Sequence, residues 1–262
     1  MSLGLQNIVT SSNYVSTGAA AYVNTHSLAL DGTDEYANIG GTSDTFFGTG
    51  DFTVSWWVKF TNHGAGNHYF FNRGRTTSSA SWDSDDHFQI YYRADLDKLQ
   101  VGAVAGGSGI GGGVIGSTLS VTDGTWFHFA LTNVKNGGSG NLKFYKNGSL
   151  VGSTSGLTGD LDAGGTGNQF AINVYANINK RQIEYDEISI HHAALDADNI
   201  DAIYNNKVAI DLSADSGNYN TSSNLAHWWK LNNDGTNSAG TGDLSPQNSD
   251  GTNFTTDVPD GS

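Results

Sequence analysis

Apolar and polar residues alternate in short runs along most of the chain, which is the pattern of strands that bury one face. The clearest example is residues 125–154, where Phe127 and Phe129 share one face of a first strand and further alternation follows. Asn147-Gly148 interrupts this segment, and both residues tolerate the positive φ that a type I′ turn requires at its two central positions. The segment therefore predicts a β-hairpin closed by a two-residue turn.

Comparable runs recur at short intervals and are separated by turn residues, among them Asp123-Gly124. The runs cover residues 27–40, 51–60, 68–74, 87–95, 98–106, 170–177, 183–192 and 226–231. Short strands at this spacing predict an all-β sandwich or barrel.

One segment has the pattern of a helix. Asp196 is placed to cap its N-terminus, with Leu195 and Ile200 in the positions of a hydrophobic staple. Asn205-Asn206 can end it. Because this helix is short, we expect it to lie across one end of the sandwich.

The chain is predicted to form a single domain, residues 26–262, preceded by a polar segment, residues 1–25. The N-terminal segment is either an edge strand or an attachment arm. Residues 206–262 form a C-terminal extension rich in Gly, Asn and Asp. Its one apolar run is a strand in which Trp228 and Trp229 point to opposite faces, so we expect one ring in the core and the other partly exposed.

Two further segments have simple interpretations. Phe254 is the one anchor of the last dozen residues and predicts a closing edge strand. The glycine-rich run at residues 105–116 follows a strand, but no helical pattern follows it, so it is not a nucleotide-binding loop. We interpret it as a loop at the rim of the sandwich.

Composition and charge narrow the function. The chain has 262 residues, no cysteine, and 12 basic against 26 acidic residues, for a net charge of −14. A chain this acidic repels a phosphate backbone, so no nucleic-acid partner is expected. The N-terminus has no basic, apolar leader and no segment has the length of a membrane span, so we expect synthesis in a cytoplasm and no membrane insertion.

Three acidic residues, Glu184, Asp186 and Glu187, superficially resemble the E-x-D-x-E signature of sandwich-fold glycoside hydrolases. Hydrolysis requires two carboxylates that face one cleft. Strand alternation places Glu184 and Asp186 on one face and Glu187 on the other, and the third carboxylate of the signature is replaced by Ile188 or Ser189. We therefore predict that the protein is not an enzyme and has no catalytic residues.

A second polar cluster, Trp82, Asp83, Asp85 and His87, precedes the strand at residues 87–95. Aromatic faces stack on sugar rings and carboxylates accept their hydroxyls, so this cluster is a candidate glycan site. The alternative is that Trp82 anchors the loop on the sandwich.

Taken in order, five stretches resemble the laminin-G-like, concanavalin A-like lectin/glucanase domains. They are residues 27–40, 51–60, 123–132, 142–154 and 185–205. The resemblance implies a two-sheet antiparallel jelly roll. The run AHWWKL, with the polar residues after it, is similar to a C-terminal extension of such domains in bacteriophage virion proteins.

The same resemblance implies a structural calcium ion held by Asp31 and Asp186, with Thr33 in the adjacent turn supplying a further oxygen. The alternative is that Asp31 only forms an Asx turn and Asp186 only accepts from a backbone amide.

These observations together predict a non-catalytic module of a phage virion, on the capsid or on a fibre. Its expected partners are other virion proteins, further copies of itself and a host-surface glycan. The alternatives are an extracellular bacterial lectin and, less favoured by the residues, a glycoside hydrolase.

Overall fold

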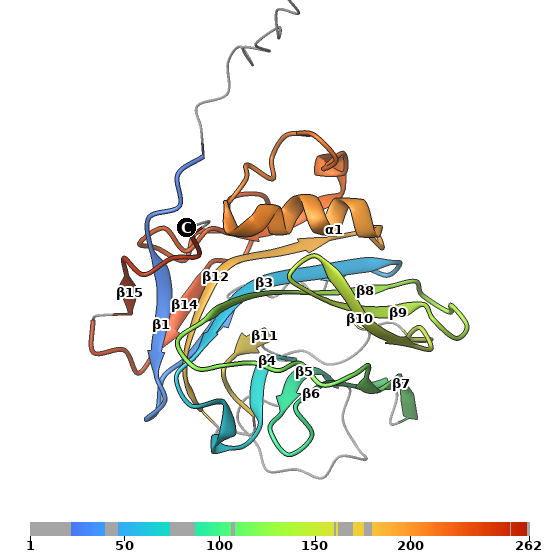
Figure 1. The fold of residues 1–262 in the computed structure, drawn as a ribbon, viewed down its shortest axis with the longest axis horizontal. Coiled ribbons are helices and arrows are strands. Elements are labelled where there is room, and N and C mark those ends of the chain that lie inside the picture. The colour runs from blue at the N-terminus through green and yellow to red at the C-terminus, as the bar shows by residue number, and fades with distance from the viewer. Residues whose placement is uncertain are drawn as a thin grey trace, which may run out of the picture.

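The computed structural model of the protein describes residues 22–39, 47–73, 87–105, 108–159, 161, 170–175, 180–251 and 253–260. Two antiparallel sheets pack face to face, and one α-helix, α1 (Ala197–Tyr204), lies outside them (Figure 1). The predicted all-β, two-sheet jelly-roll fold is confirmed. No helix in these ranges has the length and the apolar run that crossing a bilayer requires.

Each sheet is built from strands distant in sequence. The eight-stranded sheet has the order β10 (Ser149–Thr154), β9 (Leu142–Lys146), β8 (Trp126–Asn133), β3 (Phe52–Phe60), β12 (Gln182–His191), β1 (Ser27–Asp31) and β15 (Phe254–Thr255), and β13 (Leu225–Trp229) also pairs with β12. The seven-stranded sheet has the order β14 (Leu244–Gln247), β2 (Tyr36–Ile39), β11 (Phe170–Ile172), β4 (His68–Arg73), β5 (His87–Arg93), β6 (Lys98–Ala105) and β7 (Ser108–Ile115). Short 3-10 helices cover His63–Ala65, Asn205–Lys207 and Ser222–Asn224.

The main core lies between the sheets because alternate side chains of each strand point inward. Trp56 and Val58 of β3 are fully buried there, against Phe71 of β4 in the other sheet. The rings of Trp56 and Phe71 meet edge to face, with centroids 4.9 Å apart and an interplanar angle of 87°. Each such side chain contributes about 1.5–3 kcal/mol by leaving water.

Helix α1 lies on the outer face of the eight-stranded sheet, over β12 and β3, and not across one end of the sandwich (Figure 1). The expected position was wrong because outward-facing side chains of this sheet are themselves apolar and require cover. They form, with the helix and the C-terminal extension, a second buried group that we call the outer cluster. Its members are Ala130, Tyr145, Leu195, Ile200, Ile203, Leu212, Tyr219 and Trp228.

The predicted ends of α1 are confirmed. The Asp196 carboxylate accepts a hydrogen bond from the backbone N–H of Asn199 at 2.9 Å, which satisfies one free amide of the first turn. Asn205 ends the helix with a φ of 40°, a left-handed conformation that asparagine tolerates.

The predicted hairpin is also confirmed. Asn147 and Gly148 have φ values of 48° and 75°, and Lys146 pairs directly with Ser149, so the turn has two residues. A Cβ atom at Gly148 would lie 2.4 Å from the Asp201 side chain of α1. The glycine therefore serves both the turn and the close approach of the helix.

Strand β12 carries a bulge in its middle. Its register with β3 shifts between Asp186 and Ser189, and Glu187 has a φ of 46°. Tyr185 before the bulge and Ile188 after it both belong to the main core. Glu187 is the extra residue and joins Asp186 on the outer side, so the prediction that it faces the other way from Asp186 was wrong.

The glycine-rich run is not a loop, because residues 108–115 form β7, the edge strand of the seven-stranded sheet. Gly112 has a φ of 102°, and a Cβ atom there would lie 2.4 Å from the carbonyl oxygen of Val101 on β6. Glycine allows the edge backbone to approach its neighbour this closely.

The C-terminal extension adds β13 and β15 to the eight-stranded sheet. Trp229 packs in the main core and Trp228 in the outer cluster, so their predicted opposite orientation is confirmed, whereas the expected partial exposure of one ring was wrong. Phe254 opposite Leu28 confirms the closing edge strand.

Candidate ligand-binding site

A pocket of about 490 Å³ opens on the outer face of the seven-stranded sheet. We call it the tyrosine–arginine pocket. It is lined by Gly66, Asn67, Tyr69, Tyr91, Arg93 and Asp95. Strand alternation creates it, because the inward-facing Ile90 and Tyr92 of β5 leave Tyr91 and Arg93 on the outer side.

Two tyrosine rings line this pocket, and a third stacks on one of them. Tyr69 and Tyr91 are cross-strand partners on β4 and β5, with ring centroids 4.8 Å apart. Tyr175 stacks on the other face of Tyr69 at 4.7 Å with an interplanar angle of 11°. Tyr69 and Tyr91 are 6% and 5% exposed, so a ligand meets ring edges and hydroxyls rather than a free central face. Burial, with Tyr69 nearby, raises the pKa of Tyr91 to about 12, which keeps its hydroxyl neutral.

An ion pair stands beside the rings. Arg93 Nε donates to Asp95 Oδ1 at 2.9 Å, its Nη2 pairs with the other oxygen, and its Nη1 donates to Gln100 Oε1 at 3.1 Å. The hydrogen bond from Arg93 lowers the pKa of Asp95, so both groups are charged. Hydroxyl groups of a ligand would meet a donor and an acceptor side by side.

Arg181 is held beside the pocket by the side chain of Asn173 and by the backbone of Asn67. The Asn173 amide accepts from the Arg181 backbone N–H at 3.1 Å and donates to the Arg181 carbonyl at 2.8 Å. Asn173 itself has a φ of 59°. Arg181 Nε donates to the carbonyl of Asn67 at 3.1 Å. These hydrogen bonds fix the backbone of Arg181 and one nitrogen of its guanidinium next to Asn67, which lines the pocket.

The predicted glycan residues are only partly placed. Trp82, Asp83 and Asp85 lie outside the described residues. His87 begins β5, and alternation puts it on the same strand face as Tyr91, but its side chain is buried. The glycan cluster as predicted stays a prediction.

The structure does not bring the predicted calcium ligands together. Asp31 pairs with Gln182 across β1 and β12, so Asp186 lies four residues further along β12, about 13 Å away at about 3.3 Å per residue. Asp31 accepts from the Thr33 backbone N–H at 2.7 Å, which is the Asx turn that the alternative predicted. The prediction that Asp31 and Asp186 share one ion is therefore wrong. The part of the chain that the structure describes holds no group of three or more His, Asp or Glu side chains arranged for a metal.

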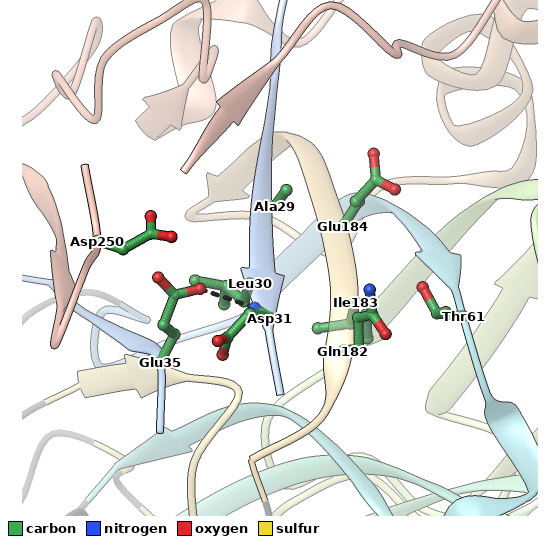
Figure 2. A pocket seen from close by; sticks show the side chains of 9 residues that line it. All are labelled: Ala29, Leu30, Asp31, Glu35, Thr61, Gln182, Ile183, Glu184 and Asp250. Atoms are coloured by element: carbon green, nitrogen blue, oxygen red, sulfur yellow. Dashed lines mark hydrogen bonds between the residues drawn. The ribbon is translucent and has the colours of Figure 1, made fainter. Parts of the chain in front are cut away.

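Asp31 instead borders a smaller acidic pocket of about 210 Å³ with Glu35, Glu184 and Asp250. Glu35 is buried and accepts from the Asp31 backbone N–H at 2.7 Å and from Asn253 Nδ2 at 2.9 Å. Figure 2 shows the Glu184 carboxylate on the other side of β1 from those of Glu35 and Asp250. Because Glu35 is held by the protein's own donors and Glu184 lies apart, this pocket has no pair of carboxylates converging on a ligand.

Asp186 and Glu187 form a buried acid pair beneath residues 22–24. Asp186 Oδ2 accepts from Asn24 Nδ2 at 2.6 Å. Glu187 accepts from the Tyr22 hydroxyl and, at 2.7 Å, from Trp228 Nε1. Burial raises the pKa of Glu187 to about 8 and raises that of Asp186 well above its ordinary value.

Glu184 is similarly engaged. It forms an ion pair with Lys59 at 2.6 Å, and Lys59 also pairs with Asp257. Burial raises the pKa of Glu184 despite this partner. The three acidic residues of the hydrolase-like run therefore lie on one outer face, but none of them opens freely into a cleft.

The sequence analysis missed the tyrosine–arginine pocket. A signal for it was present, since Tyr91 and Arg93 sit two residues apart at the end of a predicted strand and must share a face. The contribution of Arg181 had no local signal, because its position depends on Asn173, which holds its backbone, and on the carbonyl of Asn67.

One of the matched solved structures supports the fold. Among solved structures, a putative carbohydrate binding protein from Bacteroides ovatus matches with a TM-score of 0.55 and 15% identity over 90% of this chain. This chain spans 60% of that protein's length. The IT-sialidase CBM40 of Ruminococcus gnavus, bound to alpha2,3 sialyllactose, matches with a TM-score of 0.49 and 14% identity over 68% of this chain and 97% of that one. A SAP-like pentraxin from Limulus polyphemus matches with a TM-score of 0.47 and 13% identity over 86% of this chain and 98% of that one.

The sequence comparisons are more decisive about the family. Among curated proteins, no sequence matches this chain. A family model described as the concanavalin A-like lectin/glucanases superfamily matches residues 31–201, which is more than half of the chain. This protein belongs to the concanavalin A-like lectin/glucanase superfamily.

Proposed function

We propose that this protein binds a glycan without cleaving it, through the tyrosine–arginine pocket. The observation that carries the proposal is the pocket itself, in which tyrosine edges and hydroxyls stand beside the charged pair Arg93–Asp95 on an open sheet face. Sugars present both apolar ring faces and many hydroxyls, and sites that bind them combine aromatic carbon with a few oriented polar groups.

The state of the acidic residues supports binding without hydrolysis. A hydrolase of this kind requires two carboxylates that flank the bond to be cleaved. Glu187 and Asp186 are buried beneath Tyr22 and Asn24, and Glu184 is paired with Lys59. None of the three faces the tyrosine–arginine pocket, because they lie on the other sheet.

The proposal is tested by retention on immobilised glycans, with release of reducing ends measured in parallel. Because single glycan sites are weak, the protein should be presented in many copies, which raises the apparent affinity by about 10²–10⁴. Asp95→Asn removes the acceptor charge of the pocket and should abolish retention. Lys143→Gln, which changes an exposed charge on β9 of the other sheet, is the matched control and should retain binding.

Two results would contradict the proposal. Steady release of reducing ends that Glu184→Gln abolishes would make the protein an enzyme. Retention that survives Asp95→Asn and Tyr91→Ala alike would place the binding site elsewhere.

We further propose that the protein serves as a virion component, as a capsid decoration or part of a fibre, where many copies would supply this avidity. The resemblance of residues 226–243 to virion-protein extensions favours this role. Mass spectrometry of purified particles tests it, and finding the protein only free in culture medium would favour the secreted lectin instead.

A further inference from the structure

We propose, resting on the glycan-binding function above, that the glycan carries a carboxylate and that this carboxylate pairs with Arg181 at the rim of the tyrosine–arginine pocket. The ligand class is then an acidic sugar, such as a uronic or a sialic acid, rather than a neutral one.

The first observation is local charge. Although the chain has a net charge of −14, Arg93, its cross-strand partner Lys98 and Arg181 lie at or beside the pocket. Lys180 adds a further positive charge over Tyr36 of β2, in the same sheet. Asp95 is the one acidic residue that lines the pocket. Cations gathered on one face of an acidic protein create a local attractive field for an anion at that face.

The second observation is that the two arginines differ in availability. Arg93 directs all three of its nitrogens at Asp95 and Gln100. Arg181 uses Nε for the carbonyl of Asn67, and within the described ranges its two terminal nitrogens have no hydrogen-bond or ion-pair partner. Arg181 can therefore accept a new anionic partner without breaking an existing pair.

The third observation is position. Gly66 lines the pocket with a φ of 117°, and a Cβ atom there would lie 2.7 Å from Arg181 Nη2. The guanidinium thus lies directly against the pocket wall, at a point where any other residue would displace it. Asn173 fixes the backbone of Arg181 on both its N–H and its carbonyl, so the donor is held in place before a ligand arrives.

The chemistry of Arg181 and Asp95 together favours a ligand that carries a carboxylate. A guanidinium presents two parallel N–H groups that match the two oxygens of a carboxylate. Asp95, on the same rim, repels a densely charged anion such as a phosphate but accepts hydroxyls well. A ring that bears one carboxylate and several hydroxyls satisfies both groups, whereas a neutral sugar leaves Arg181 without a partner.

The test uses an array of uronic- and sialic-acid oligosaccharides, each printed beside its own carboxyl-reduced form, in which the acid is a primary alcohol. At low salt we expect at least one acidic member to bind about tenfold or more tightly than its reduced counterpart, the size typical of a hydrogen bond to a charged group. Raising the salt concentration should shrink this preference.

Variants assign the effect to one residue. Arg181→Gln should remove the preference for the acid while leaving weak binding of the reduced form, and Arg181→Lys should restore it only in part because an ammonium lacks the planar fork. Lys143→Gln should change nothing. A thermal melt of each variant checks that it folds.

The possible outcomes distinguish failure of this inference from failure of the proposed glycan-binding function. Equal binding of acidic and reduced members overturns the inference and leaves the glycan-binding proposal standing. A preference that survives Arg181→Gln, or that Lys143→Gln removes equally, also overturns it. Binding of no member in either form also overturns the inference, and retention on the wider set of immobilised glycans then decides the glycan-binding proposal.

Discussion

Strand alternation directs side chains outward from both sheets. On one sheet these side chains are covered by α1, and on the other they border a pocket. On the eight-stranded sheet, outward-facing Trp57 and His128 are buried against Tyr204 of α1, with ring centroids 5.7 and 6.1 Å from it. On the seven-stranded sheet, outward-facing Tyr69 and Tyr91 border an open pocket. Whether an outward aromatic group stabilises the fold or meets a ligand is decided by what covers it.

The covered face should be the sensitive one for stability. Trp228→Ala removes a fully buried indole from the outer cluster and leaves the Glu187 carboxylate without one of its donors. We expect the free energy of unfolding to fall by about 3–5 kcal/mol, measured by urea denaturation. A fall below about 1 kcal/mol would mean that the cover over this face contributes little.

The buried acid pair Asp186–Glu187, beneath residues 22–24, should make the stability of the covered face depend on pH. Burial raises the pKa of Glu187 to about 8, so between about pH 4.5 and 8 the folded state holds a proton that the unfolded state has released. Stability should therefore fall as the pH rises through this window, by up to about 1.4 kcal/mol per pH unit.

The measurement is a series of denaturation curves from pH 6.5 to 8, compared with Glu187→Gln. This range avoids His128 and His191, whose pKa values burial lowers to about 3 and which destabilise the fold as the pH falls below about 6.5. The glutamine variant should show a flatter profile and gain relative stability toward pH 8. Parallel profiles would show that Glu187 does not titrate there.

The turn under α1 offers a smaller effect on the same face. Gly148→Ala forces a side chain into a φ of 75° and toward Asp201, so we expect a loss of about 1–3 kcal/mol. Gly138→Ala is the matched control, because a Cβ atom there meets no neighbouring atom within 4 Å. Equal melting temperatures for the two variants would contradict the role of the turn.

On the open face of the seven-stranded sheet, a substitution should affect ligand binding more than stability. Tyr91→Phe keeps the stacked ring and removes one hydroxyl, so its free energy of unfolding should stay within about 0.5 kcal/mol of the parent. Glycan retention should nevertheless weaken. A variant that loses stability and keeps binding would reverse the comparison between the two faces.

Local patterns predicted the parts of this fold that depend on local chemistry. Asn147-Gly148 can form its turn alone, and Asp196 caps a helix wherever that helix lies. The prediction of where α1 lies was wrong because its position depends on outward-facing residues of the sheet, such as Tyr145 of β9, which are distant in sequence from the helix. Simple alternation failed at Glu187 because one extra residue in β12 reverses every orientation after it.

The predicted pairing of Asp31 with Asp186 was wrong for a related reason. Asp31 and Asp186 were paired through a family resemblance, and only the register of β1 on β12 shows how far apart they lie. The tyrosine–arginine pocket combines residues 66–69 with residues 91–95, and Arg181 lies beside it. No pattern within one segment links these three parts of the chain.

The way the chain's two ends share β12 has a consequence for how the protein is made. β1 pairs with β12 along residues 182–185 and with β15 near the C-terminus, and β13 occupies the rest of the same edge of β12. During synthesis β1 leaves the ribosome long before either of its partners exists, and loop closure over such a separation is slow. The eight-stranded sheet is therefore completed only after the last strands have been translated, and a chain released early would leave β12 with an open edge that favours aggregation.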